Sequence, residues 1–250
     1  MSKSKQPSPA RLIYEAWQNI YKGEQPRPWD IEKIRVDKGE ICATDGKVVY
    51  LALTQDTLTE NFDGFWSPVN GTKPKISHEK DGIIRLPDRP FVALALGTTW
   101  YMGQDYPFPP IEKVIPEEEN HIEIDGKKLC RLMETLKKGR QRRIKDRKGY
   151  WINQYTLILS LHATGEKAEI VGTAQKKQKD KDGDIITGEK ETIFTESLPC
   201  SGKAQKVCFD PRLYRLTESP EYLSITCKHE PIQFFLRQRR LIMCPIKMPE

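Results

Sequence analysis

The sequence predicts an α+β protein in which helices form one layer against antiparallel sheets, in two successive modules. Three observations support this prediction. An amphipathic segment opens the chain, alternating strand-like segments follow it, and the same order begins again after a proline-rich stretch near residue 110. With 250 residues, of which 37% are hydrophobic and 30% charged, the chain can build two cores of ordinary size under a well-solvated surface.

The first module is predicted over residues 9–107, after a disordered tail (1–8) that is rich in Lys, Ser, Pro and Gln. It begins with apolar residues at helical spacing and continues with strands whose residues alternate. No second helix is evident between residues 54 and 100, so this module is expected to be abbreviated. The predicted elements are a helix over 9–21, a meander over 31–53 and strands over 83–86 and 91–96.

The second module is predicted over residues 108–250, because the three prolines of segment 106–110 favour a connector between domains. Asp125 can cap a helix with one apolar stripe, and Gly139 can end it. A second short helix is predicted to begin at Asp210-Pro211. The remaining predicted elements are strands over 155–161, 168–173, 192–194, 222–227, 231–237 and 241–246, with a polar hairpin over 175–188.

The basic residues are concentrated in one segment. Between Gly126 and Lys148 the chain has eleven Lys or Arg against two acids, a local excess of nine positive charges, whereas the net charge of the whole chain is +6. On the predicted helix, Lys127, Arg131 and Lys138 fall opposite the apolar stripe at about 100° per residue. Such cations suit a protein that must hold phosphates without reading bases. The alternative is a solvated helix face followed by a disordered basic loop.

Other classes of site find little support in the sequence. The six cysteines include no C-x-x-C pair, which argues against a zinc site or a disulfide framework. Asp180, Asp182, Asp184 and Glu191 match part of a calcium loop, but its sixth position is Ile185 instead of Gly, and a polar hairpin explains the same residues. No cofactor-binding or catalytic motif is present, and no cofactor is expected. The chain lacks a long apolar run and a secretory signal, so a cytoplasmic protein is expected.

Four local sequences, in this order and spacing, carry a resemblance to a known family. They are ATDGKV at 43–48, FPPIEKVIP at 108–116, the helix over 124–136 and LIMCPIKM at 241–248. Together they resemble the second and third domains of the bacterial DNA polymerase III beta subunit, the sliding clamp of DNA replication.

The resemblance implies DNA-clamp (processivity-fold) domains, with antiparallel sheets outside and helices on the inner face of a ring around duplex DNA. It implies a non-enzymatic processivity factor, an accessory subunit of DNA polymerase that forms a homo-oligomer and binds polymerase and clamp-loader peptides. The helix and the basic run then supply the expected DNA-binding residues: Lys113, Lys127, Lys128, Arg131, Lys138, Arg140, Arg142, Arg143 and Lys145. The family's peptide pocket maps onto Thr44, Gly46, Lys47, Val48, Val114, Cys244, Pro245, Ile246 and Met248.

Two departures keep other functions open. The family's turn usually continues with His-Arg-Leu, whereas Lys47, Val48 and Val49 stand here, and family members carry three domains where this chain has room for about two. A clamp relative that occupies clamp partners as a decoy, without encircling DNA, is the first alternative. A nucleic-acid hydrolase is the second. The apolar end of the chain also fits an ordinary edge strand instead of a peptide pocket.

Overall fold

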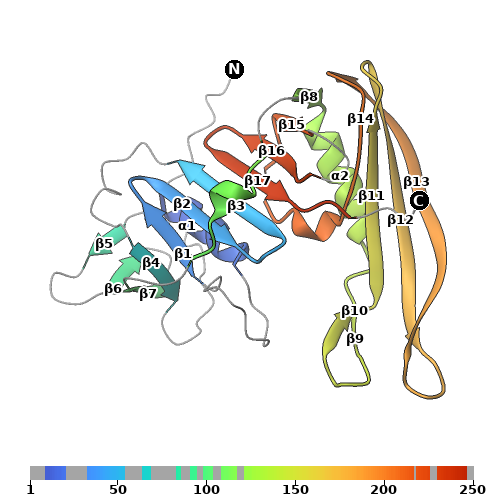
Figure 1. The fold of residues 1–250 in the computed structure, drawn as a ribbon, viewed down its shortest axis with the longest axis horizontal. Helices are drawn as coiled ribbons and strands as arrows, with labels where there is room; N and C mark the ends of the chain where they lie inside the picture. Colours follow the sequence, from blue (N-terminus) through green and yellow to red (C-terminus); the bar gives the residue numbers. More distant parts are fainter. Residues whose placement is uncertain are drawn as a thin grey trace. The chain divides into compact units, whose positions relative to one another are not determined.

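The computed structural model describes residues 9–20, 33–53, 64–68, 83–85, 91–94, 98–103, 108–116, 121–216, 218–225 and 230–246. The chain divides into two compact units (Figure 1). Unit 1 comprises Met1–Val114 and Gln238–Leu241, and unit 2 comprises Ile115–Arg237 and Ile242–Glu250. The predicted tail over residues 1–8 lies outside the described residues, and the predicted boundary at residues 107 and 108 stays a prediction.

Unit 1 consists of one helix and an antiparallel sheet. Leu12, Ile13 and Ala16 of the helix are buried, because its apolar face packs against the first three strands. The strands lie in the order β3-β2-β1-β4-β7-β6-β5, with β17 next to β3. The elements are α1 (Pro9–Gln18), β1 (Ile34–Asp37), β2 (Glu40–Thr44), β3 (Val48–Leu53), β4 (Gly64–Pro68), β5 (Ile83–Arg85), β6 (Phe91–Leu94), β7 (Thr98–Gly103), η3 (Ile111–Lys113) and, as far as Leu241, β17 (Arg239–Met243).

Unit 2 consists of a longer helix and a sheet with two long strands. The strands lie in the order β14-β11-β12-β13-β8-β15-β16, and β9 and β10 form a separate two-stranded hairpin. The elements are β8 (His121–Ile124), α2 (Gly126–Lys137), β9 (Arg143–Lys145), β10 (Trp151–Asn153), β11 (Tyr155–Ala163), β12 (Lys167–Lys179), β13 (Ile185–Ser201), β14 (Gln205–Phe209), η4 (Pro211–Leu213), β15 (Tyr222–Ser224) and β16 (Ile232–Leu236).

The two units share a topology. In unit 1, α1 is followed by strands in the spatial order β4-β1-β2-β3, and in unit 2, α2 is followed by β11 to β14 in the order β14-β11-β12-β13. If the four strands after each helix are numbered 1 to 4 along the chain, they lie in both units in the order 4-1-2-3, which is that of a Greek key. The chain therefore contains the same supersecondary unit twice, as two successive modules require.

Helix α2 forms where the sequence predicts it. Asp125 caps it by accepting a hydrogen bond from the Lys128 amide at 3.0 Å, and Gly139, with φ of +71°, lies just after its end. Leu129, Met133 and Leu136 are buried, and the helix packs against β11 and β12. Burial of this stripe turns the charged residues of α2 other than Lys137 toward solvent.

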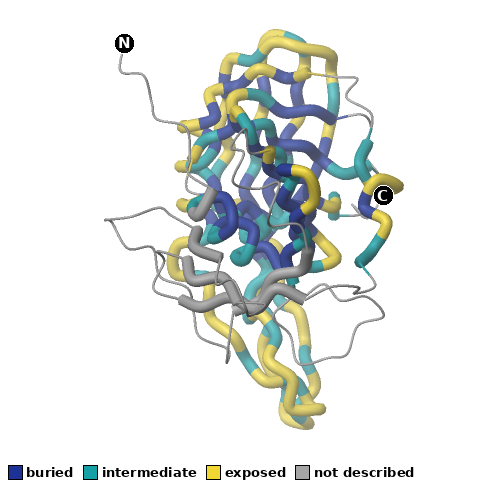
Figure 2. Tube along the Cα trace, turned by 90° about the vertical axis from the view of Figure 1, so that its left-hand side faces the viewer, coloured by how far each residue is buried: buried dark blue, intermediate teal, exposed yellow. Residues whose placement is uncertain are grey.

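Most of the predicted elements are confirmed, with differences at the second helix and at some strands. The helix predicted to begin at Asp210-Pro211 is a single turn of 3-10 helix, η4, although Asp210 does accept from the Arg212 amide at 3.0 Å. The polar hairpin predicted over 175–188 is confirmed, because β12 and β13 pair up to Lys179 and Ile185 on either side of its turn. Figure 2 shows that the hairpins furthest from the core of unit 2 are mainly exposed. β4, β7, β8, β14 and the β9–β10 hairpin were not predicted.

Candidate nucleic-acid interface

The exposed side of α2 is predominantly cationic. Lys127, Lys128, Arg131 and Lys138 are all exposed. The acid of this helix, Glu134, pairs with Lys137, three residues away. Within the part of the chain that the structure describes, the four exposed cations form no ion pair. Their charge is therefore turned toward solvent without a protein carboxylate to neutralise it, as a phosphate-binding surface requires.

The basic run continues from α2 into the β9–β10 hairpin. Arg140, Arg142, Arg143 and Lys145 lie on the segment from the end of α2 to the end of β9. Arg140 is half-buried and donates to the carbonyl of Lys138 at 3.2 Å, and the other three are exposed. Eight of the nine predicted DNA-binding residues thus belong to one continuous segment of unit 2. Lys113 does not, because it lies in η3 of unit 1.

The β9–β10 hairpin carries residues that the sequence prediction missed. Lys145 lies over the ring of Trp151, with its Nζ 5.2 Å from the centroid, and Arg143 donates to the Trp151 carbonyl at 3.2 Å. Tyr150 and Trp151 are 47% and 53% exposed. The signal that could have revealed them is the pair of aromatic residues that directly follows the basic run.

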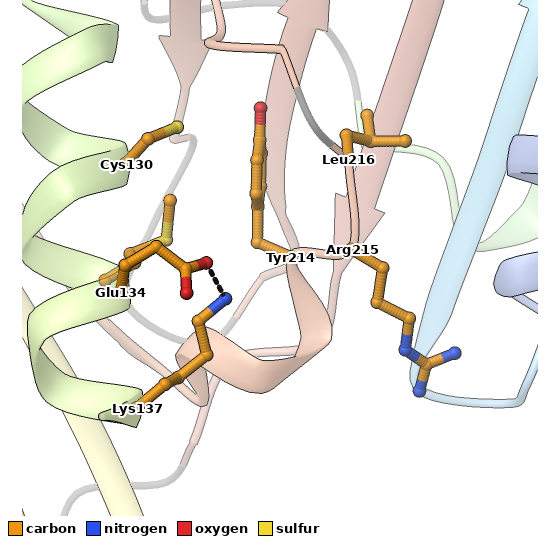
Figure 3. A pocket seen from close by; sticks show the side chains of 7 residues that line it. Cys130, Glu134, Lys137, Tyr214, Arg215 and Leu216 are labelled. Carbon is orange, nitrogen blue, oxygen red and sulfur yellow. Dashed lines mark ion pairs between the residues drawn. The ribbon is translucent and has the colours of Figure 1, made fainter. Parts of the chain in front are cut away.

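A cavity of about 340 Å³ lies between α2 and the segment after η4 (Figure 3). Cys130, Glu134 and Lys137 line it from α2, and Tyr214 and Leu216 line it from the opposite side. Burial raises the pKa of the Cys130 thiol above its usual value. The cavity is lined in part by apolar side chains, and of its two cations, Lys137 and Arg215, Lys137 is already paired with Glu134, so it is a poorer anion site than the exposed side of α2.

The predicted peptide pocket draws on both units, and each part can be described in its own unit. In unit 1, the Thr44–Val48 turn is tightly hydrogen bonded: the Thr44 hydroxyl donates to the Val48 carbonyl at 2.7 Å, and Asp45 accepts from the amides of Lys47 and Val48 at 2.9 and 3.0 Å. Gly46, with φ of +83°, allows the turn.

The other predicted pocket residues lie near the ends of η3 and β17. Val114 of unit 1 is 51% exposed. In unit 2, Cys244 is exposed, Pro245 is half-buried, and the Ile246 amide donates to the Cys208 carbonyl at 2.7 Å. Met248 lies outside the described residues. Because these residues are divided between the units, the assembled pocket stays a prediction.

The described residues were also compared with the metal sites that the sequence raised. They contain no group of three or more His, Cys, Asp or Glu side chains that could hold a metal ion. The Asp180 carboxylate of the calcium-like sequence accepts from the amides of Asp182 and Asp184 at 3.0 and 2.8 Å, as in a polar turn. A helix long and apolar enough to span a membrane was also not found in the described segments.

Comparison with known proteins gives a consistent result at the level of the fold. No model of a protein family matches the sequence, and no curated protein matches it. Among solved structures, the DNA polymerase sliding clamp from Bacillus subtilis aligns with 99% of this chain and 68% of its own, at a TM-score of 0.57 and 14% identity.

Two further structures show the same similarity to sliding clamps. A putative DNA polymerase III beta subunit from Eubacterium rectale aligns with 99% of this chain and 68% of its own, at a TM-score of 0.57 and 10% identity. The sliding clamp from Bartonella birtlesii, solved bound to griselimycin, aligns with 96% of this chain and 64% of its own, at a TM-score of 0.54 and 12% identity. The predicted resemblance and fold class are confirmed: this chain has the fold of the bacterial DNA polymerase sliding clamps.

Proposed function

We propose that this protein is a sliding-clamp-like processivity factor that holds duplex DNA through the exposed side of α2 and the basic run that follows it. The observation that carries the proposal is the exposed cationic side of α2 in a protein with the sliding-clamp fold. The proposed role is non-catalytic, with the protein acting as an accessory to a DNA polymerase.

The chemistry of α2 fits a contact that slides. Lys and Arg side chains neutralise phosphates at a distance from the helix axis, and phosphate contacts carry no sequence information. Such contacts can be exchanged from one phosphate to the next at little cost. The helix itself is fixed by the buried stripe of Leu129, Met133 and Leu136, so the cations are presented from a rigid element.

The proposal is tested by measuring the affinity for duplex DNA at several salt concentrations. The logarithm of the affinity constant is expected to fall with the logarithm of the salt concentration, with a slope of about −0.9 for each phosphate contacted. The double variant Lys127→Glu/Arg131→Glu is expected to bind at least about tenfold more weakly and with a shallower slope, because two contacts are lost.

The matched control is Lys167→Glu/Lys203→Glu, which makes the same charge change at exposed positions on other parts of unit 2. This control should retain most of the affinity and the slope of the unaltered protein. Equal losses in both double variants would mean that only the net charge matters, and salt-independent binding would remove the proposal.

The chain spans about two thirds of the length of the Bacillus subtilis clamp, at 68%. The proposal also includes a closed homo-oligomeric ring, as the resemblance to sliding clamps implies. Light scattering with and without closed circular duplex DNA tests this part. A multimer that remains on the circle and is released when the circle is cut supports encirclement. A monomer that is never retained favours the decoy interpretation instead.

The proposal also includes docking of short polymerase and clamp-loader peptides at the predicted pocket residues. The formed turn over Thr44–Val48 and the exposed apolar side chain of Val114 support it. Griselimycin, to which the Bartonella birtlesii clamp was solved bound, is a suitable probe. Val114→Lys is expected to abolish its binding, whereas Leu53→Lys, a change at another exposed apolar residue of unit 1, should not. Unchanged binding in Val114→Lys would exclude this residue from the pocket.

A further inference from the structure

The β9–β10 hairpin has two faces of different chemistry. Trp151 pairs with Lys145 and Asn153 pairs with Arg143 across the hairpin, while Ile152 pairs with Ile144 between them. Because successive residues of a strand point to opposite faces, the first two pairs share one face and the isoleucines share the other. The isoleucines are half-buried, and Arg143, Lys145, Trp151 and Asn153 are exposed. These four residues are called the Trp151 face.

Trp151 is a costly residue to leave in water. Trp151 is 53% exposed, although exposing an indole to water costs more free energy than exposing almost any other side chain. Within the described residues it is flanked by cations: Lys145 lies 5.2 Å from the ring centroid, and Arg143 is hydrogen bonded to the Trp151 carbonyl. An exposed aromatic ring between cations is the arrangement with which proteins bind single-stranded nucleic acid.

The hairpin holds this face in a defined position. At its turn, the Asp146 amide donates to the Tyr150 carbonyl at 2.8 Å, and the Tyr150 amide donates to the Asp146 carboxylate at 2.9 Å. At its base, the backbone amide of Gln154 donates to the Arg142 carbonyl at 2.9 Å, and the backbone amide of Lys177 in β12 donates to the Gln154 carbonyl at 2.7 Å. Asp146, the sole acid of the hairpin, therefore stabilises the turn, and the Trp151 face itself carries no acid.

We propose that the Trp151 face binds single-stranded DNA. The indole stacks on an unpaired base, and the Asn153 amide is positioned to hydrogen bond with a base edge. Arg143 and Lys145, at the end of the basic run, contact the phosphates where the unpaired strand leaves the duplex. This inference deepens the proposed function and rests on it, because it places an unpaired strand beside the duplex contact of α2. A protein with both contacts would favour a junction between duplex and single strand over a continuous duplex.

The chemistry of the face favours an unpaired strand over other partners. In a duplex the faces of the bases are stacked on one another, so an indole gains a stacking partner only where a base is unpaired. A membrane surface is a poorer fit, because the face offers a single large apolar side chain among two cations and an amide. Binding to an interface in the membrane requires a larger apolar area.

The test measures fluorescence anisotropy of two labelled probes, a 20-nucleotide oligothymidine and a duplex of 20 base pairs, with the full chain at low and moderate salt. Trp151→Ala is expected to weaken binding of the oligothymidine about 5- to 150-fold, the range for loss of one stacked base. The same variant should bind the duplex within about twofold of the unaltered protein. Trp151→Phe keeps an aromatic ring and should recover most of the affinity for the single strand.

The control is Ile186→Ala, which removes an exposed apolar side chain from β13 of the same unit and should change neither affinity. Equal affinity of Trp151→Ala and the unaltered protein for oligothymidine would overturn the inference, as would no binding of oligothymidine at low salt. Equal losses for both probes would overturn it too, because the face would then be a duplex contact. Failure of the proposed function has a different signature: Lys127→Glu/Arg131→Glu would bind the duplex as well as the unaltered protein does.

Discussion

The guanidinium of Arg239 contacts both carboxylate oxygens of Glu15, with Nη1 at 3.0 and 2.9 Å, although 224 residues separate them in the sequence. Both side chains belong to unit 1 and are almost completely buried. Arg11 and Tyr50 donate to the same carboxylate at 2.8 and 3.1 Å. The strand β17 is therefore tied to α1 through a charged group that is fully surrounded by donors.

The first prediction concerns this buried pair. Arg239→Met is expected to lower the free energy of unfolding by about 3–5 kcal/mol, because the Glu15 carboxylate would stay buried without its main counter-charge. Denaturant titration measures the change. The exposed pair of Arg147 and Asp184 provides the control, since Arg147→Met should cost less than about 1 kcal/mol. Similar losses in both variants would contradict the assigned role of Arg239.

The second prediction concerns alkaline pH. Burial, with the Glu15 carboxylate beside it, raises the pKa of Tyr50 well above its usual value of 10.0. The folded state therefore keeps a proton that the unfolded state releases, so this contribution to stability is complete below pH 10 and is lost as the pH rises above it.

Tyr50→Phe isolates that contribution. At pH 8 the variant should be less stable by about 1–3 kcal/mol, because the hydroxyl that donates to Glu15 is removed. At pH 11, one unit above the usual pKa of Tyr, ionisation of Tyr50 stabilises the unfolded state of the unaltered protein by about 1.4 kcal/mol. Phe cannot ionise, so the difference in stability between the two proteins should be smaller by that amount. The comparison uses denaturant titrations at both pH values, and a difference that grows between pH 8 and 11 would have the wrong sign.

The third prediction concerns the packing of α2. Leu129 is completely buried, so Leu129→Ala should cost about 2–5 kcal/mol through the lost contacts and the cavity that remains. Leu132, three residues further along the same helix, is only half-buried, and Leu132→Ala should cost clearly less. Thermal unfolding of both variants checks the order. If Leu132→Ala were the more destabilising change, the assigned buried face of α2 would be wrong.

The fourth prediction concerns thiol reactivity. Burial raises the pKa of Cys42 and Cys130, so at pH 8 both carry less of the reactive thiolate than an exposed cysteine does. Cys244 is exposed and is expected to react first with iodoacetamide, followed by Cys130 and last by Cys42. Peptide mass mapping of samples taken at successive times measures the order in which the cysteines are modified. Early modification of Cys42 in the folded protein would show that its site opens readily.

The sequence predicts the elements whose apolar residues repeat regularly. Leu129, Met133 and Leu136 mark the buried stripe of α2, and Asp125 marks the N-cap before it, so the cationic side follows from the same periodicity. The β12–β13 hairpin is predicted as a polar hairpin, but the length of its strands is not, because its outer part is rich in Lys, Gln and Asp and lacks an apolar alternation. Its strands are held by backbone pairing with each other, which side-chain composition does not reveal.

Two features could not be predicted, one because its strands are short and the other because it depends on a contact that is distant in the sequence. The strands of the β9–β10 hairpin have three residues each, too few for a period of two to stand out in a run of charges. The Trp151 face depends on the register that places Lys145 opposite Trp151. The pair of Glu15 and Arg239 depends on the return of the chain to unit 1 near its end, for which no local pattern exists.

This late return has a consequence for how the protein is made. Unit 1 is not a continuous stretch of sequence, because Gln238–Leu241 belong to it and Leu53 donates from its amide to Gln238 at 2.9 Å. A ribosome completes the N-terminal stretch long before it reaches these residues, so a nascent chain must carry Glu15 without its arginine while Ile115–Arg237 of unit 2 is being synthesised. A fragment cut at residue 114 would remain permanently in that incomplete state.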